Sequence, residues 1–182
     1  MAEHTGELEP ADLHRLRAAQ GWLALGLPRD AARELQAIQG AAFLHSSTLD
    51  MRWAVAAALA DWSEAHGVGE TSVQQHPRHE WGWINRSYAA RRMPGGGLIL
   101  AQKQLSPALS LFPKSSLIPY NLACYACQLG DIEAAMHCFS IAETRHAKSR
   151  EKAECIRTRA LADADLAPVH DWIRSLPKTR KK

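Results

Sequence analysis

The chain has 182 residues, a formal net charge of +3, 46% hydrophobic residues, 23% charged residues and four cysteines. This composition excludes disordered and disulfide-dense proteins and is typical of a globular chain that buries one core or a short array of repeats. The N-terminal MAEHTGELEP is polar, and no stretch is apolar over the length of a membrane span. We therefore expect a cytoplasmic protein with reduced cysteines and no membrane association.

The positive charge is concentrated in the last residues, at 177–182, where a basic tail is expected. Over the rest of the chain, basic and acidic residues are mixed. A specific nucleic-acid interface needs basic residues on one structured face with aromatics between them. The sequence therefore predicts no specific nucleic-acid partner.

Pairs of short helices separated by turns are predicted along the chain. The second helix of each pair is expected at DAARELQAI (30–38), DWSEAHGVGETSVQQHP (61–77), GLILAQKQLSPALSLFP (97–113) and GDIEAAMHCFSIA (130–142). A small residue recurs near the start of these helices, at Ala31, Ala65, Ala101 and Ala135. The positions four residues later are Leu35, Gly69, Leu105 and Phe139, and those after a further three are Ile38, Ser72, Ala108 and Ala142. We expect these positions to pack inward, because a small residue lets two helices approach closely.

The second pair departs from this pattern. Gly67 and Gly69 lie where helix-forming residues are expected. Each glycine costs about 1 kcal/mol in a helix interior relative to alanine. The sequence therefore predicts a short, bent or loosely packed helix over 61–77.

Glycines follow the first helices of two pairs, and further helices follow the last pair. Gly26 comes after Trp22 and Leu23, and Gly130 comes after Tyr120 and Leu122, which suits a left-handed helix C-cap. After the fourth pair, apolar residues continue at helical spacing, namely Ala153, Ile156, Ala160, Leu161, Leu166, Val169, Trp172 and Ile173. We predict a capping segment there, with Asp163 or Asp165 as the N-cap of its last helix.

These features resemble the tetratricopeptide repeat family, whose period is about 34 residues. The resemblance covers roughly residues 11–146 and is strongest in the fourth unit, at Leu122, Ala123, Gly130, Ala135, Phe139 and Ala142. It implies an all-α, single-domain solenoid of about four helical hairpins. The implied boundaries are 11–43, 46–79 (degenerate), 80–115 and 116–147, followed by cap helices at 148–176 and the basic tail at 177–182.

The resemblance also implies a concave groove that binds a peptide or a partner helix. Carried over by position, the lining residues are Trp81, Ile84, Asn85, Tyr88, Arg91 and Arg92 in the third unit, and Leu117, Tyr120, Asn121, Cys124, Cys127 and Gln128 in the fourth. Asn85 and Asn121 would hold a ligand backbone or bond to neighbouring repeats. The family's clamp for chaperone tails needs Lys and Asn where Leu16 and Gln20 stand, which disfavours that ligand.

Two motifs in the sequence are candidates for a metal or redox site. Cys124 and Cys127 form a C-x-x-C, but near a helix C-terminus, where the dipole disfavours a thiolate, and without a full set of zinc ligands. His76 and His79 form an H-x-x-H with a proline between them, which predicts exposed loop histidines. We therefore expect no metal, no cofactor and no catalytic residue.

The sequence favours a non-enzymatic module that binds a protein or peptide partner. One alternative is a structural protein that self-associates through its degenerate second unit into a homo-oligomer. A remoter alternative is a metal or redox protein that uses Cys124 and Cys127. These three hypotheses come from different functional classes and predict different binding experiments.

Overall fold

A computed structural model describes residues 7–148 and 153–177. The described residues form helices and connecting turns and contain no strand, which confirms the all-α class. Part of the predicted cap (149–152) and nearly all of the basic tail (178–182) lie outside the described residues. No helix in the described part of the chain is long and apolar enough to cross a membrane.

The contacts divide the chain into two compact units, residues 1–101 and 102–182. The division falls inside α6 (Leu98–Leu105). The predicted single-domain organisation and its repeat boundaries stay predictions.

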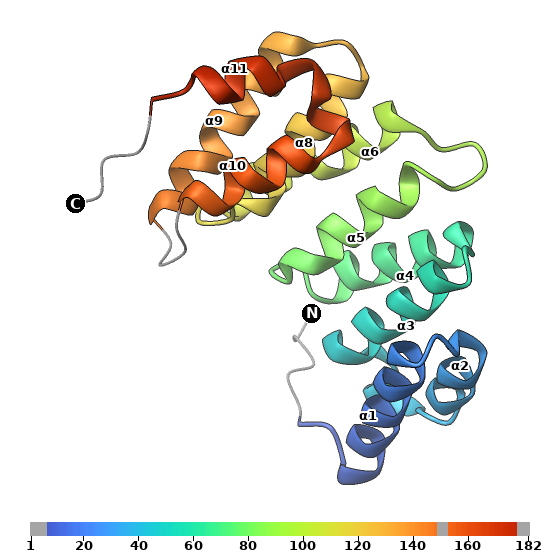
Figure 1. Cartoon of the computed structure of the whole chain (residues 1–182). Coiled ribbons are helices and arrows are strands. Elements are labelled where there is room, and N and C mark those ends of the chain that lie inside the picture. Colours follow the sequence, from blue (N-terminus) through green and yellow to red (C-terminus); the bar gives the residue numbers. More distant parts are fainter. Residues whose placement is uncertain (1–6, 149–152, 178–182) are drawn as a thin grey trace. The chain divides into compact units, whose positions relative to one another are not determined.

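In the first unit, successive helices pack against one another (Figure 1). They are α1 (Pro10–Ala24), α2 (Pro28–Gln36), the 3-10 helix η1 (Gly40–Leu44), α3 (Ser46–Ala58), α4 (Trp62–Gln75) and α5 (Glu80–Ala90). Helix α1 pairs with α2, α3 pairs with α4, and α5 packs on α4. The core of the first hairpin also contacts α3, and its buried residues are Leu16, Ala19, Ala31, Leu35, Ile38 and Val55.

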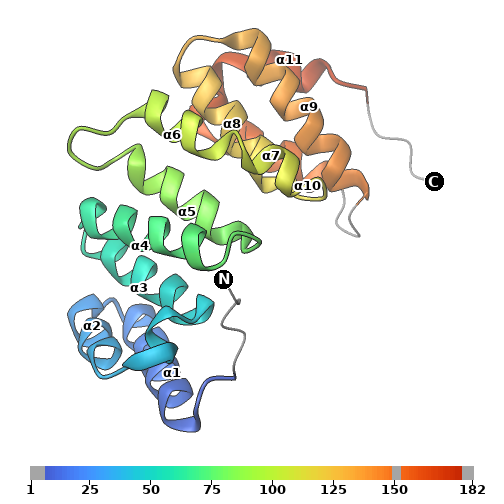
Figure 2. The same ribbon diagram turned by 180° about the vertical axis from the view of Figure 1, so that it is seen from behind.

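The second unit is built around the pair α8 (Leu117–Gln128) and α9 (Ile132–Lys148), seen from behind in Figure 2. Helix α7 (Ala108–Leu111) precedes this pair. The segments α10 (Ala153–Ala162), η2 (Ala164–Val169) and α11 (His170–Ser175) follow it. Leu166, Val169 and Ile173 from the last segments are buried against Phe139 of α9 and its neighbours. These C-terminal segments therefore contribute to the core of this unit, and Asp163 caps η2 rather than the last helix α11, whose N-cap is Val169.

The positions that the period identified are buried. Ala31, Ala65, Ala101 and Ala135 are each 0% exposed. The positions four and seven residues further on are also buried, namely Leu35, Gly69, Leu105 and Phe139, then Ile38, Ser72, Ala108 and Ala142. This burial confirms the predicted inward-facing register.

The turn inside three of the helical pairs has the same geometry. Gly26 and Gly130 have φ values of 73° and 82°, which confirms the predicted left-handed caps. One backbone hydrogen bond recurs in each turn, from the N–H of Leu27 to Trp22 O, of Asp61 to Ala56 O, and of Asp131 to Ala126 O. In the turn between α3 and α4, Ala60 occupies the glycine position with a φ of 57°. Alanine is disfavoured in this conformation. Because no glycine marks this turn, the sequence did not indicate its left-handed geometry.

Helix α4 corrects the prediction for the second helical pair. It runs without interruption from Trp62 to Gln75, and Ala65, Val68 and Gly69 are buried in it. A Cβ at Gly69 would lie 2.7 Å from the Arg86 Cα of α5. The expectation of a short or loosely packed helix is wrong, because Gly69 allows the α4 and α5 backbones to approach closely.

The predicted helix over 97–113 is interrupted. Helix α6 ends at Leu105 and α7 begins at Ala108, with Ser106 and Pro107 between them. Proline has no N–H to donate and its ring clashes with the preceding turn. Pro107 therefore breaks this helix. The proline is visible in the sequence, but the helix prediction did not take it into account.

Candidate functional site

Helix α5 carries the first set of predicted binding residues. Its Gly82, Arg86 and Ala89 lie against α4 and its neighbourhood. The adjacent face is partly exposed, with Trp81 50% exposed and Asn85, Tyr88, Arg91 and Arg92 half-buried. Ile84 differs from these five, because its side chain is 6% exposed and belongs to the core.

An aromatic and arginine cluster lies at the C-terminal end of α5. The Tyr88 ring is 5.8 Å from the Trp53 ring and 6.0 Å from the Trp62 ring, between centroids. The Arg92 guanidinium carbon lies 3.5 Å from the Tyr88 centroid and 5.3 Å from that of Trp62. Arg92 also donates to the Tyr88 carbonyl, at 3.1 Å, and Trp53 Nε1 donates to the Asn85 carbonyl, at 3.0 Å. These contacts fix the position of the guanidinium.

Sequence reasoning included Tyr88 and Arg92 and missed Trp53 and Trp62. Both tryptophans belong to the second helical pair, whose departure from the repeat pattern left its groove positions unassigned. The signal was present, because two tryptophans nine residues apart flank the turn between α3 and α4. Only the packing of α5 on both helices brings them to Tyr88.

Helix α8 carries the second set, and η2 covers much of it. Tyr120 Oη donates to Asp163, at 2.9 Å, and Gln128 Nε2 donates to the Asp165 carbonyl, at 3.1 Å. Cys124 and Cys127 are 5% and 4% exposed. A partner would meet Tyr120, Cys124 and Cys127 only if the chain's own C-terminal segment moved away, whereas Gln128 is exposed.

The two remaining residues of this set are half-buried. Asn121 Nδ2 donates to the Leu117 carbonyl within α8, at 2.8 Å. That bond uses one of the two amide protons of Asn121 and leaves the amide oxygen for another donor. The expectation that Asn121 binds a ligand or a neighbouring repeat stays a prediction.

Asp163 is the centre of the polar contacts under η2. Its carboxylate accepts from Tyr120 Oη, from the Asp165 N–H at 3.0 Å and from Cys124 Sγ at 3.7 Å. Burial, together with this carboxylate, raises the pKa of Tyr120 and of the Cys124 thiol. Burial also raises the pKa of Cys127. Tyr120, Cys124 and Cys127 therefore keep their protons at physiological pH. This disfavours thiolate chemistry at the two cysteines.

Cys124, Asp163 and Asp165 are the described residues that come closest to a metal site. Their ligand atoms lie within 4.8 Å of one another. A cation there would have to compete with the three hydrogen bonds that Asp163 already accepts. A half-buried carboxylate that is satisfied by donors in this way belongs to a structural network. The arrangement explains the position of η2 without a ligand.

The structure corrects the prediction for the histidine pair. His76 is 9% exposed, and its Nε2 lies 2.7 Å from the Leu44 carbonyl. His79 Nε2 lies 2.8 and 2.9 Å from the two carboxylate oxygens of Asp50. These residues are not free loop histidines, because the loop between α4 and α5 folds back onto η1 and α3.

The pair of His79 and Asp50 predicts a pH dependence of stability. The hydrogen bond to Asp50 raises the pKa of His79 above its usual 6.5, with a smaller contribution from the charge of Glu80 and against partial desolvation. The stabilisation is therefore fully present below about pH 6.5 and is lost as the pH rises through the higher folded-state pKa. We expect wild type to lose more stability than His79→Gln between pH 5.5 and 8.5 in urea unfolding. Equal losses in the two proteins would contradict this prediction.

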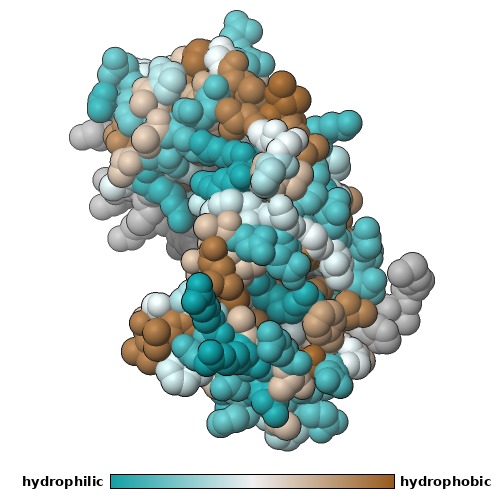
Figure 3. Space-filling view, turned by 90° about the vertical axis from the view of Figure 1, so that its right-hand side faces the viewer, coloured by the Kyte–Doolittle hydropathy of each residue, from teal (hydrophilic) through white to brown (hydrophobic). Residues whose placement is uncertain are grey.

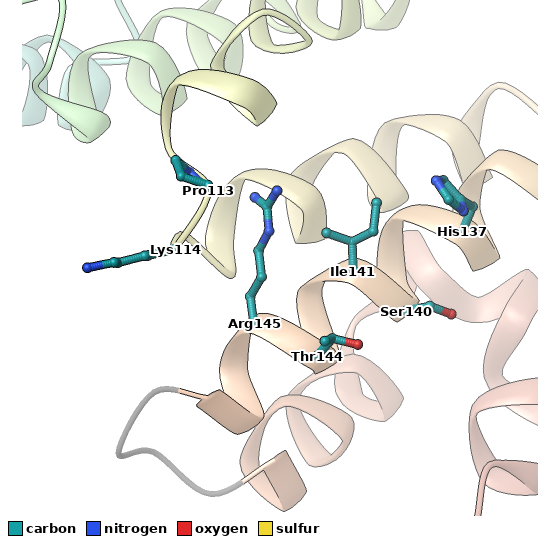
Figure 4. Close-up of a pocket in the computed structure, with 7 residues that line it drawn as sticks. All are labelled: Pro113, Lys114, His137, Ser140, Ile141, Thr144 and Arg145. Carbon is teal, nitrogen blue, oxygen red and sulfur yellow. The ribbon is translucent and has the colours of Figure 1, made fainter.

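One pocket lies in the second unit and has a volume of about 650 Å³. It is lined by Pro113 and Lys114 before α8, and by His137, Ser140, Ile141, Thr144 and Arg145 of α9 (Figure 4). Arg145 extends toward Pro113 and donates to the carbonyls of Leu109, Phe112 and Ser115, each at 3.2 Å. Ser140 Oγ donates to the Met136 carbonyl, at 2.9 Å. Arg145 and the Ser140 hydroxyl are therefore engaged in hydrogen bonds to the backbone.

Exposed apolar side chains do not form one continuous surface on the face in Figure 3, where separate hydrophobic patches are surrounded by hydrophilic residues. The exposed large apolar residues are Leu13, Leu25, Leu27, Phe43, Leu59, Trp81, Ile99, Leu111 and Leu129. Scattered exposed apolar residues are normal on globular proteins. Trp81 is distinguished from the others by its place on α5, the helix that also carries Tyr88 of the aromatic and arginine cluster.

No family model matches the sequence, and a search of curated proteins found no match. The class that the structure defines is an all-α protein with packed helical pairs.

Proposed function

We propose that the chain is a non-enzymatic protein-interaction module of the tetratricopeptide type. Two observations support the repeat architecture: the buried alanine register and the shared turn geometry in three helical pairs. Repeat architectures of this kind use the surface of their first helices to bind partners. The partner is a protein or peptide.

The single observation that carries the proposal is the partly exposed face of α5. It combines Trp81, which is half exposed, with Tyr88 and Arg92, whose positions are fixed by packing. Tryptophan, tyrosine and arginine dominate the energetics of protein interfaces, because they offer a large contact area and directed donors. A side chain that is already held in place loses less entropy on binding.

The proposal assigns the main binding surface to α5 rather than α8. On α8, Tyr120, Cys124 and Gln128 already contact the Asp163 and Asp165 region of the same chain. Displacing η2 would expose Leu166 and Val169, which are 0% exposed. Burial of such side chains contributes about 1.5–3 kcal/mol each, so a partner would have to offset a large cost.

Affinity capture from the native host, read by mass spectrometry, tests the proposal. The bait is the full chain, and the comparison bait carries Trp81→Ala with Asn85→Ala. We expect the captured partner to be lost with the double variant, since both side chains lie on the partly exposed face of α5. The control is Leu25→Ala, whose side chain is 71% exposed at the turn between α1 and α2 and should change nothing.

Circular dichroism of all three baits verifies that the helices are intact. A partner that is captured equally by the double variant would place binding elsewhere. Capture of no protein above background would argue against an interaction module.

A further inference from the structure

The pocket beside α9 has the volume of a small-molecule site. It measures about 650 Å³, and such sites span about 300–1,000 Å³. Its floor is one face of α9 between His137 and Arg145, and its wall is the loop at Pro113 and Lys114 (Figure 4). Eight residues at 1.5 Å each give this floor a length of about 12 Å. The pocket can therefore hold a small molecule along α9.

The wall of the pocket is fixed to its floor. Arg145 donates to three carbonyls of the segment before α8, those of Leu109, Phe112 and Ser115, each at 3.2 Å. Ser115 Oγ accepts from the Ile118 N–H, at 3.1 Å, which joins the wall to the first turn of α8. A site with fixed walls loses little conformational entropy when a ligand binds.

Arg145 brings a positive charge to the pocket without a carboxylate to balance it. Within the described part of the chain, its hydrogen-bond partners are the three carbonyls. A carbonyl oxygen carries only a partial charge, so these bonds position the guanidinium without neutralising it. They leave at least two of its five N–H donors for a ligand. Because Arg145 is half-buried, an anion in the pocket would supply the missing counter-charge.

The elements around the pocket carry few carboxylates. Residues 102–130, which include the wall and α8, contain two lysines and no acidic residue. On α9, Glu143 pairs with Arg157, and Glu133 lies one turn before His137, outside the lining. Lys114 extends away from α9 in Figure 4, so Arg145 is the cation that a ligand would contact. The local charge therefore favours an anionic ligand.

We infer that this pocket binds a small organic anion, whose carboxylate or phosphate contacts Arg145 and whose apolar part lies on Pro113 and Ile141. These two residues supply apolar surface in the lining, and Ile141 is half-buried in the floor. A nucleic acid would need a series of cations along its backbone, whereas one fixed arginine suits a single anionic group. The inference is independent of the partner surface proposed on α5.

Titration of the isotope-labelled full chain with octanoate, followed by NMR, tests the inference. Octyl phosphate, octanol and octylamine carry the same apolar chain with other head groups. We expect octanoate, octyl phosphate or both to shift the amide signals of residues 137–145 saturably, and octanol and octylamine to bind at least about tenfold more weakly. Burial of the apolar chain alone would favour octanol, because a carboxylate costs more to desolvate.

A variant at the rim of the pocket tests the role of charge. Replacing Arg145 would also release the loop that it holds, so the variant is Thr144→Glu, at an exposed residue of the lining. Its carboxylate should weaken octanoate binding at least about tenfold, by repulsion and by competition for Arg145, and should leave octanol binding unchanged.

Arg174→Gln is the matched control, because it changes the net charge by the same amount. Arg174 is 58% exposed and is paired with Asp171 on α11, away from the residues that line the pocket. This variant should bind octanoate as wild type does. Circular dichroism verifies that both variants fold.

Three results would each overturn the inference: octanol binding as tightly as octanoate and octyl phosphate, unchanged octanoate affinity in Thr144→Glu, or amide shifts that are spread over both units without saturation. None of these results bears on partner capture by α5. Conversely, failure of the capture experiment leaves the anion site standing.

Discussion

Replacing Gly69 with alanine is expected to lower the free energy of unfolding by about 2 kcal/mol, the middle of the range for overpacking a helix contact. The new Cβ would lie 2.7 Å from Arg86 Cα and 2.9 Å from Arg86 N. Both are backbone atoms of α5, so relief requires the two helices to separate. The loss of packing outweighs the gain of up to about 1 kcal/mol that alanine brings to a helix interior. Urea unfolding followed by circular dichroism measures the effect.

Gly67 provides a matched control on the same helix. A Cβ there meets no atom within 4 Å, and its φ is not in the left-handed region. Gly67→Ala should therefore stabilise the protein by about 0.5–1 kcal/mol. Effects of the same sign at the two positions would show that helix propensity, rather than the approach of α4 to α5, decides the role of these glycines.

Replacing Asp163 with alanine is expected to lower the free energy of unfolding by about 3 kcal/mol. The change removes the acceptor for Tyr120 Oη, for Cys124 Sγ and for the Asp165 N–H in the first turn of η2. Loss of a cap costs about 1 kcal/mol, and each buried donor left without a partner costs about 1–3 kcal/mol. Hydrogen exchange should also become faster in η2 and α11, because Asp163 holds this segment against α8.

Asp171→Ala is the control for that experiment. Asp171 is fully exposed and forms an ion pair with Arg174 at the surface of α11. Exposed pairs contribute little to stability, so its replacement should change the unfolding free energy by less than about 1 kcal/mol. An Asp163→Ala protein as stable as this control would contradict a central role for the Asp163 contacts.

Much of the fold followed from local features of the sequence. A helix exposes the same face every few residues, so the recurring alanines and their large neighbours were enough to mark the buried register. Gly26 and Gly130 marked turns, because a left-handed backbone strongly favours glycine. Like these glycines, Pro107 indicates a local backbone feature, here a helix break, but the prediction of one helix over 97–113 ignored it.

The candidate site was predicted only in part, because local spacing along one helix can be predicted from the sequence and packing between helices cannot. The period placed Trp81, Asn85, Tyr88 and Arg92 on one helix face, since spacing along a single helix is a local property. It did not place Trp53 and Trp62 at Tyr88, because their contact depends on how three helices pack. Nor did it place η2 over Tyr120 and Cys124, residues that lie about forty positions before their partners in the chain.

By itself, the sequence determined the helices, the inward-facing positions and most of the turns, because these depend on periodicity and on the backbone preferences of single residues. Only the tertiary structure showed which residues outside the repeat pattern form contacts between distant parts of the chain. Gly69 became a close helix contact, His79 became the partner of Asp50, and Asp163 became the acceptor that fixes η2. Each of these contacts joins residues far apart in the chain, where no local pattern specifies which groups will meet.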